Sequence, residues 1–331
     1  MPASLSSGDS PSGMEKSPPY YRSAGTSQPT PSGVISSGSL KLDILLGRGG
    51  YPAGAIVEIS GSQASGKTVL CQHAAAGAQR MGRLCAWIDA DRSLSLSFAQ
   101  TCGVNSADLY YCDPTTTEQA LDILVTLAHS GAFSLIVLDS LPSLIPQEEF
   151  QGKAEHLPEQ INFDLLSDTL HTLRRLVSIS GTVVLITNRY DPGLAVIYRR
   201  LSENPQRLSL KLNASIRIRM SIIEQLRAGE QAIGVKVQAR ILKNKFAPFL
   251  NSTDFDIIHR QGINKPAEVL DLGVSLNEIQ EQDGSFRYGS LLLGTSASDA
   301  VRFLERNERT SELVESEIRR KLIPDYFSAA T

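Results

Sequence analysis

Residues 61–68 combine the residue types and the spacing that bind a phosphate chain. They read Gly-Ser-Gln-Ala-Ser-Gly-Lys-Thr, which fits the pattern G-x-x-x-x-G-K-[ST]. The two glycines let the backbone turn so tightly that successive N–H groups face one anion, and a following helix adds the positive end of its dipole. We therefore expect a nucleotide to be bound by Gly61, Ser62, Gln63, Ala64, Ser65, Gly66, Lys67 and Thr68. In this pattern Lys67 reaches the β- and γ-phosphates, and the Thr68 hydroxyl binds magnesium.

The segments on either side of this loop are of the types that the pattern requires. An apolar, strand-like run covers residues 56–60, and a helix-forming run covers residues 69–80. The alternative is a glycine-rich turn that matches the pattern by chance. Because both flanking elements are present, we favour a phosphate-binding loop.

Three more buried strands are predicted at residues 84–89, 135–139 and 182–188, and helical spacing separates them at residues 117–130 and 158–179. Strands that alternate with helices predict an α/β fold, with a mainly parallel central sheet flanked by helices. Ligands of such sheets bind at the carboxyl ends of the strands. The residues predicted at those ends are Gly61, Asp91, Asp139 and Asn188.

The remainder of the chain predicts further units. Residues 1–33 are rich in Ser, Pro and Gly and predict a disordered tail, and a short helix is expected within residues 35–47. Residues 214–220, 234–243 and 254–259 are β-rich and complete a core over residues 34–266. We expect a small α+β C-terminal domain over residues 267–325, with Ser296 and Thr310 as helix N-caps, and a tail at residues 326–331.

Composition limits the classes of function. The 331 residues carry a formal net charge of −3, so any contact with nucleic acid must come from a local basic patch. The four cysteines form no C-x-x-C pair, which predicts neither a zinc site nor a disulfide framework and favours a reduced, cytoplasmic protein. No apolar run is long enough to span a bilayer, so no membrane partner is expected.

Several separate segments resemble the bacterial RecA recombinase family, in the same order and at similar separations. They are SSGSLKLDILLGRGGYPAGAIVEISGSQASGKT, LCAWIDADRSLS, LIVLDSLPSLIP, LKNKFAPF and INKPAEVLDLGV. The resemblance covers residues 34–322. It implies a RecA-type ATPase core with a small C-terminal domain, and it implies ATP and Mg²⁺ as ligands.

The resemblance also implies roles for single residues. Thr68 and Asp139 would hold magnesium, Lys67 would bind phosphate, and Asp91 occupies the position of the catalytic glutamate that orients the attacking water. Three further sets of residues match the family's nucleotide contacts. Phe98 falls where an aromatic ring packs on adenine, and Asn188 and Arg189 fall where an Asn-Gln pair senses the γ-phosphate. Lys243 and Lys245 match lysines that reach the ATP of a neighbouring subunit. The resemblance thus implies self-association, or pairing with another RecA-type subunit, through the Lys243 and Lys245 side.

Two positions of the nucleotide site depart from the family pattern. Asp91 replaces the glutamate, and its carboxylate is one methylene shorter. Since a displacement of about 1 Å in a positioning group can cost roughly 100-fold in rate, we expect slow hydrolysis. Arg189 replaces the sensing glutamine, so its guanidinium either pairs with the γ-phosphate, as an arginine finger does, or faces DNA.

The two regions that match the family's DNA-binding loops are also rewritten. The first, residues 148–164, is mainly acidic and would repel a phosphate backbone. The second, residues 190–209, offers an aromatic residue with three arginines, a set that suits single-stranded DNA: Tyr198, Arg199, Arg200 and Arg207. An ordinary charged surface is the alternative. The family's N-terminal helix, which builds the filament, has no counterpart in residues 1–33.

Two hypotheses remain from the sequence. The first is an ATP-dependent protein of DNA repair and homologous recombination, which binds single-stranded DNA in an ATP-bound state and hydrolyses ATP slowly. The second is a paralogue that binds ATP structurally and acts as an adaptor for repair proteins, in a DNA-damage (SOS) response or a mutagenic-synthesis complex. A P-loop ATPase without a nucleic-acid role is a third reading, which the resemblance disfavours.

Overall fold

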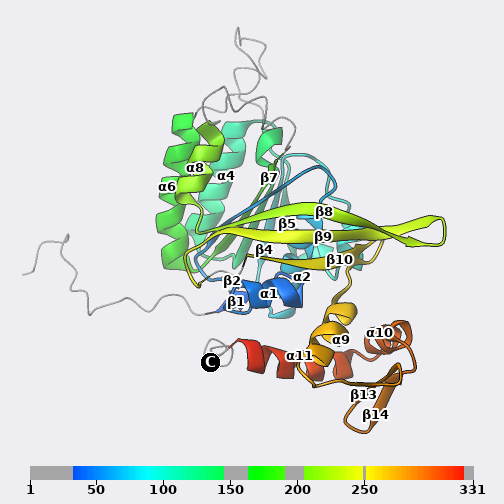
Figure 1. Ribbon diagram of the computed structural model, residues 1–331. Helices are drawn as coiled ribbons and strands as arrows, with labels where there is room; N and C mark the ends of the chain where they lie inside the picture. Colours follow the sequence, from blue (N-terminus) through cyan, green and yellow to red (C-terminus); the bar gives the residue numbers. More distant parts are fainter. Residues whose placement is uncertain (1–32, 145–162, 191–204, 249–250, 324–331) are drawn as a thin grey trace, which may run out of the picture.

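The computed structural model describes residues 33–144, 163–190, 205–248 and 251–323. A nine-stranded sheet lies at its centre, in the order β11-β10-β9-β8-β3-β7-β6-β4-β5 (Figure 1). Strands β8, β3, β7, β6, β4 and β5 run parallel, whereas β9, β10 and β11 are added antiparallel. The strands are β3 (Ile56–Gly61), β4 (Cys85–Asp89), β5 (Leu109–Cys112), β6 (Leu135–Asp139), β7 (Val183–Arg189), β8 (Ile216–Ala228), β9 (Gln231–Asn244), β10 (Ser252–Ile258) and β11 (Gly262–Ile263). The predicted α/β fold with a mainly parallel central sheet is confirmed.

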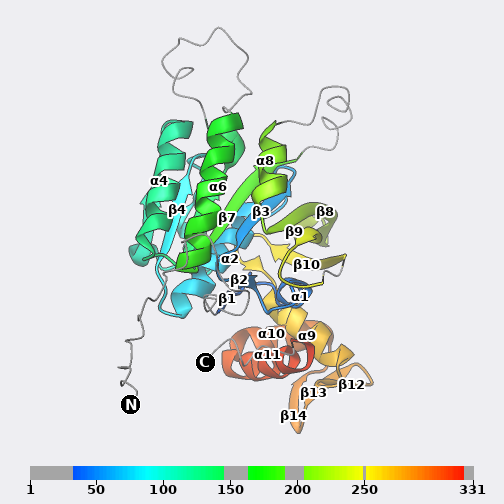
Figure 2. The same ribbon diagram turned by 90° about the vertical axis from the view of Figure 1, so that its left-hand side faces the viewer.

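Helices cover both faces of this sheet. One face carries α1 (Leu40–Leu45), α2 (Lys67–Arg80) and α3 (Leu96–Thr101). The other carries α4 (Thr117–Ser130), α6 (Phe163–Ser180) and α8 (Pro205–Asn213), which stand side by side in Figure 2. In α6 the buried residues recur at helical spacing, as Leu166, Leu170, Leu173 and Val177, so one stripe faces the sheet.

The strand that leads into the phosphate loop is buried on both faces. In β3, Ile56 packs in the core beneath α4 and α6, whereas Val57 and Ile59 pack in the core beneath α2. Each such side chain contributes about 1.5–3 kcal/mol when it is fully buried. The alternating contacts fix the register of β3, and the end of β3 sets where the loop begins.

The last part of the chain forms a second, smaller core. It contains α9 (Lys265–Ser275), the antiparallel strands β12 (Gln280–Gln282), β13 (Ser285–Tyr288) and β14 (Leu291–Gly294), and helices α10 (Ala297–Arg306) and α11 (Glu308–Leu322). This α+β part lies below the sheet in Figure 1, and Leu40 of α1 packs into its core. The predicted boundary after residue 266 falls inside α9, so the division into domains stays a prediction.

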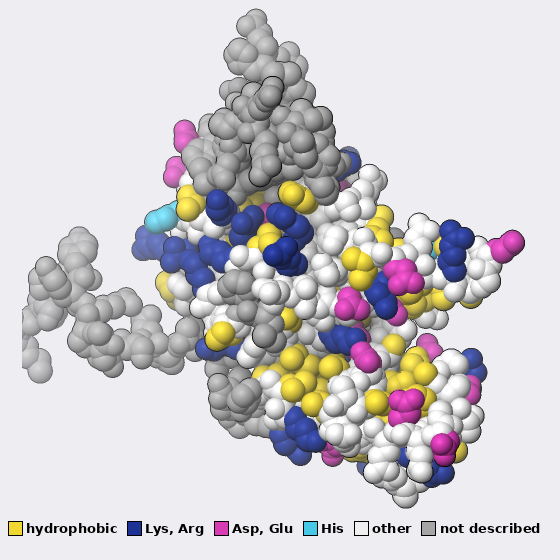
Figure 3. Space-filling view, viewed as in Figure 1, with side chains coloured by type: hydrophobic (Ala, Val, Ile, Leu, Met, Phe, Trp, Pro, Cys, Tyr) yellow, Lys and Arg dark blue, Asp and Glu magenta, His cyan; other side chains and the backbone are white. Residues whose placement is uncertain are grey.

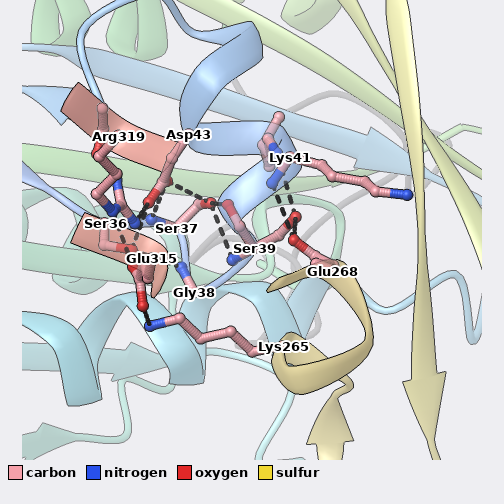
Figure 4. A network of polar contacts seen from close by, with 12 residues as sticks. Ser36, Ser37, Gly38, Ser39, Lys41, Asp43, Lys265, Glu268, Glu315 and Arg319 are labelled. Carbon is pink, nitrogen blue, oxygen red and sulfur yellow. Dashed lines mark hydrogen bonds and ion pairs between the residues drawn. The ribbon is translucent and has the colours of Figure 1, made fainter. Parts of the chain in front are cut away.

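A buried polar network joins the smaller core to the part built on the nine-stranded sheet (Figure 4). The Arg319 guanidinium of α11 donates to the Asp43 carboxylate of α1 at 2.7 Å and to Glu315 at 2.8 Å. Asp43 also accepts from the Ser37 backbone N–H and hydroxyl, both at 2.7 Å. Lys265 of α9 contacts the second oxygen of Glu315 at 2.6 Å. The network therefore ties α1, α9 and α11 together through paired charges rather than through apolar packing alone.

Glu268 forms a second polar link in the same joint. Its Oε2 accepts from the Ser39 hydroxyl at 3.1 Å and from the Lys41 N–H at 2.9 Å. Its Oε1 is buried and has no hydrogen-bond partner among the described residues. Burial raises the pKa of this carboxyl to about 8. Burial thus favours the protonated, neutral form of Glu268, whereas the hydrogen bonds from Lys41 and Ser39 favour the charged form.

Two details differ from the sequence prediction. The segment expected as one helix begins with strand β1 (Val34–Ile35), which pairs with β2 (Tyr51–Pro52), and α1 starts only after Gly38, whose φ is 90°. The Thr310 N-cap is wrong, because only Asn307 separates α10 from α11 and α11 therefore begins at Glu308. The Ser296 cap is confirmed, since its hydroxyl accepts from the Asp299 N–H. No helix in the described ranges is long and apolar enough to cross a membrane.

Candidate nucleotide site

The phosphate loop, residues 61–68, runs from the last residue of β3 into the first turn of α2. Its backbone is left-handed at Ala64 and at Gly66, with φ of 60° and 87°. A Cβ on Gly61 would lie 2.4 Å from the Ser65 Oγ and 2.5 Å from the Met220 carbonyl oxygen, so only glycine fits there. The Ser65 hydroxyl is buried and lacks a hydrogen-bond partner among the described residues. A tight cradle with an unsatisfied buried hydroxyl fits a bound anion.

Lys67 is held at this cradle by the loop itself. Its ammonium donates to the carbonyl oxygens of Gly61 and Ser62, at 3.2 and 2.7 Å. Burial lowers the pKa of Lys67, and the nearby Asp139 carboxylate opposes that change. Hydrogen bonds to phosphate are stronger than those to neutral carbonyls. The same ammonium is therefore placed to exchange its carbonyl partners for phosphate oxygens.

Thr68 and Asp139 meet across α2 and β6. The Thr68 Oγ1 donates to Asp139 Oδ2 at 2.8 Å, and the Thr187 hydroxyl of β7 donates to Asp139 Oδ1. Burial raises the pKa of Asp139, whereas these two hydrogen bonds lower it. Hydroxyl and carboxylate oxygens are the ligands that Mg²⁺ prefers, and Mg²⁺ usually keeps several waters and few protein ligands. The donor set fits magnesium bound beside a phosphate chain.

Asp91 lies in the turn after β4 and faces the same site. The Ser140 hydroxyl donates to Asp91 Oδ2 at 3.0 Å, and the Ser143 hydroxyl lies 3.0 Å from Ser140 Oγ. Burial raises the pKa of Asp91 and Asp89 adds to that, whereas the Ser140 hydrogen bond, Lys67 and Arg189 lower it. The carboxylate therefore sits within the field of the loop lysine, at the mouth of the site.

Asn188 and Arg189 end strand β7 beside the loop. The Asn188 amide donates to the buried Glu58 of β3 at 3.0 Å, and Glu58 also binds Arg217 of β8. Asn188 is therefore held by a charged pair beneath the loop. Arg189 is exposed, and its charge acts on Lys67 and Asp91. The next residue, Tyr190, donates its N–H to the Gly61 carbonyl and stacks under Arg219 at 3.8 Å.

Lys243 and Lys245 lie away from this loop, at the end of β9. The Lys243 ammonium donates to the carbonyls of Lys211 and Leu212, at 2.7 and 3.2 Å, and so caps the last turn of α8. Burial, then Lys245 and other nearby cations, lower the pKa of Lys243 to about 8. Lys and Arg side chains gather on this face over α6 and α8 (Figure 3). Lys245, Arg217 and Arg174 act on Lys243, so Lys243 belongs to a group of cations at the end of β9.

The structure brings together the loop, Asp91, Asp139, Asn188 and Arg189 at the carboxyl ends of β3, β4, β6 and β7. Phe98 is half-buried on α3, and its role toward adenine stays a prediction. Tyr198, Arg199 and Arg200 lie outside the described residues, and Arg207 is placed only as part of α8.

Sequence reasoning missed the side chains that support these residues, namely Thr187, Ser140, Ser143, Glu58 and Arg217. A signal existed for Glu58, which is a lone acid in the apolar run Ile-Val-Glu-Ile. Buried charges are normally paired, so a partner was to be expected. No comparable signal marked Ser140 and Ser143, because serine is common after strands.

Comparison with known proteins gives a consistent assignment. The model of the RecA N-terminal domain matches residues 23–264. Protein RecA of Caldanaerobacter subterraneus subsp. tengcongensis is 36% identical over 286 residues, covering 86% of this chain and 84% of the relative. Protein RecA of Ehrlichia canis is 36% identical over 291 residues (88% and 82%), and that of Nitrobacter winogradskyi is 37% identical over 286 residues (86% and 79%).

A solved structure is similar in fold. The crystal structure of the RadB recombinase superposes with a TM-score of 0.51 at 21% identity, covering 70% of this chain and 98% of that one. At this identity the likeness concerns the fold alone. Together with the family model, which spans most of the chain, and the curated relatives, the phosphate loop and its acids show that this chain belongs to the RecA family.

Proposed function

We propose that this protein is an ATP- and Mg²⁺-dependent DNA-binding protein of DNA repair and homologous recombination, which binds single-stranded DNA in its ATP-bound state and hydrolyses ATP slowly. The observation that carries the proposal is the contact of Thr68 Oγ1 with Asp139 Oδ2 at 2.8 Å, beside the Lys67 ammonium. Membership of the RecA family supports the pathway and both ligands.

The residues divide into three tasks in this proposal. The loop N–H groups and Lys67 bind the triphosphate, and Thr68 with Asp139 holds magnesium directly or through water. When bound, magnesium neutralises charge that develops on the phosphates. Asp91 is assigned to orienting the attacking water, and Arg189, whose charge acts on Lys67 and Asp91, is assigned to the γ-phosphate. The short Asp91 side chain supports slow turnover.

Contact with DNA is assigned to the segment that follows β7. Tyr198, Arg199, Arg200 and Arg207 supply an aromatic face and positive charge, which suit single strands. Tyr190 links this segment to the site, because its N–H binds the Gly61 carbonyl at 3.0 Å. We assign this hydrogen bond as the route by which ATP binding at the loop would act on the segment that follows.

The basic surface around Lys243 and Lys245 supports assembly. Burial lowers the pKa of Lys243 to about 8, and the nearby cations Lys245, Arg217 and Arg174 add to that, so an incoming anion would relieve repulsion there. The triphosphate of a neighbouring RecA-type subunit is an anion of this kind. We therefore assign this surface to self-association or to pairing with a related subunit.

A second function is favoured by the identity of residue 91. An aspartate in place of the family's glutamate has a shorter reach toward the attacking water, which is compatible with a protein that holds ATP without turning it over. Such a paralogue would act as an adaptor for repair proteins in a DNA-damage response or in mutagenic synthesis. It would bind ATP as the first function does, and it would differ in lacking hydrolysis stimulated by single-stranded DNA.

The test measures retention of a fluorescent oligo-dT strand by the full chain with Mg-ATP, without nucleotide and with Lys67→Ala, over a salt titration that starts low. We expect ATP to raise the affinity of the wild type and not that of Lys67→Ala. Lys321→Ala, which removes an exposed lysine of α11, serves as the charge-matched control. Equal retention with and without ATP contradicts ATP-gated DNA binding, and ATP turnover that single strands accelerate contradicts the adaptor function.

A further inference from the structure

Three hydrogen-bonded side chains connect the short 3-10 helix η2 (Leu141–Ser143) to the nucleotide site. Ser143 Oγ lies 3.0 Å from Ser140 Oγ, which lies 3.0 Å from Asp91 Oδ2. Ser140 is 8% exposed and directly follows Asp139, the last residue of β6. The chain of hydroxyls therefore ends on the carboxylate that faces the phosphate loop.

Counting hydrogens fixes the direction of both bonds. A serine hydroxyl has one hydrogen to donate, and an ionised carboxylate has none. Ser140 must therefore give its hydrogen to Asp91 and can only accept from Ser143. The bonds run from Ser143 to Ser140 to Asp91, and each hydroxyl is polarised by the next bond along.

The backbone holds both ends of this chain in place. The N–H groups of Ala90 and Asp91 donate to the Asp139 carbonyl, at 2.8 and 3.3 Å. Ser143 returns toward Ser140 because its N–H donates to the Ser140 carbonyl at 3.2 Å and because Leu141 is buried. The Asp91 carboxylate is thus fixed relative to Asp139, the residue that we assign to magnesium.

We propose that Ser143 and Ser140 are positioning residues for ATP hydrolysis, which bind one oxygen of Asp91 so that the other is aimed at the attacking water. The inference rests on the proposed function, since it concerns the rate of that reaction. Asp91 has a shorter reach than a glutamate, so neighbouring residues have to hold its carboxylate in the productive orientation. The two hydroxyls supply that restraint through their hydrogen bonds to each other and to Asp91.

The test compares Ser143→Ala, Ser140→Ala and the double variant by steady-state ATP turnover, with nucleotide affinity measured separately by a fluorescent ATP analogue. Losing one net hydrogen bond predicts a kcat about 5-fold lower for Ser143→Ala, and about 10-fold lower for Ser140→Ala. KM and the nucleotide Kd should stay within about twofold, because the inference has both hydroxyls act on Asp91 and not on the nucleotide. Since Ser143 acts through Ser140, the double variant should equal Ser140→Ala alone.

Two further variants separate positioning from folding. Ser143→Thr keeps the hydroxyl and should retain turnover, whereas Ser143→Cys keeps the size with a weak donor and should lose it. Ser275→Ala removes an exposed hydroxyl of α9 that binds the Leu272 carbonyl, and it should leave kcat unchanged. Unfolding curves identify any variant that is not folded. Among the folded variants, a kcat that is retained in Ser143→Thr and lost in Ser143→Cys supports the positioning role.

The outcomes distinguish this inference from the proposed function. Wild-type turnover with an unchanged kcat in Ser143→Ala overturns the positioning role alone. A wild type that binds Mg-ATP without measurable turnover also overturns it, and leaves nucleotide binding standing. A wild type that binds no ATP overturns the proposed function itself. A fall in affinity equal to the fall in kcat would mark a structural effect and also contradict the inference.

Discussion

Replacement of Glu268 by glutamine tests the polar contact that joins the smaller core to α1, in which Glu268 accepts from Ser39 and Lys41. Glu268 is 3% exposed, and one of its oxygens accepts from Ser39 and Lys41 while the other has no partner in the described part of the chain. Burial raises the pKa of the folded carboxyl to about 8, from a reference value of 4.5. Glu268→Gln gives a side chain of the same shape that is neutral at every pH.

The magnitude follows from linkage. The Glu268 carboxyl holds its proton more tightly in the folded state than in the unfolded state. The stabilisation from this protonated carboxyl is therefore fully present below pH 4.5 and is lost as the pH rises through 8. Each pH unit in that window changes the free energy of unfolding by up to about 1.4 kcal/mol. Between pH 5.5 and 7.5 the wild type should therefore lose up to about 3 kcal/mol from this group.

The assay is urea unfolding of the full chain at pH 5.5 and pH 7.5. Relative to the wild type, the stability of Glu268→Gln should rise by about 2–3 kcal/mol between pH 5.5 and pH 7.5, because only the wild type loses the contribution of the protonated carboxyl. Glu281→Gln, an exposed acid on β12, is the matched control and should show no pH-dependent difference. A difference between Glu268→Gln and wild type that is the same at both pH values, or larger at pH 5.5, would refute the reasoning.

Three further predictions concern catalysis, the joint and DNA. Asp91→Glu should raise ATP turnover by about 10-fold or more, because the carboxylate regains its reach; steady-state turnover that does not rise shows that Asp91 does not position the water. Arg319→Ala leaves Asp43 and Glu315 without their buried partner and should lower the free energy of unfolding by about 3–5 kcal/mol. The control Arg302→Ala, at an exposed arginine, should lower it by less than about 0.5 kcal/mol, and equal losses in denaturant unfolding would contradict the network. Arg199→Ala should reduce the salt dependence of single-strand binding by about one ion, and an unchanged salt slope removes this arginine from the interface.

Local patterns in the sequence were sufficient to predict the fold. The strands that end at Gly61 and Asp139 are short apolar runs buried on both faces, and the loop between β3 and α2 has a spacing that few other structures require. These signals lie within a few residues of one another, so they can be recognised without knowing what packs against them.

The supporting contacts could not be predicted, because they join distant residues. Arg217 meets Glu58 only through the pairing of β8 with β3, and Arg319 meets Asp43 across 276 positions. Thr310 shows that a pattern of neighbouring residues can also predict a contact that the fold does not make. It is a good capping residue, but α10 ends at Arg306 and leaves Asn307 as the cap of α11.

Isothermal titration calorimetry of the full chain with ATP, with and without magnesium, tests the central claim most directly. We predict magnesium-dependent binding by the wild type that weakens at least about 10-fold in Lys67→Ala, because the ammonium is then missing from the phosphates. Absence of magnesium-dependent binding, or binding that Lys67→Ala leaves unchanged, would contradict the assignment of this loop as the nucleotide site.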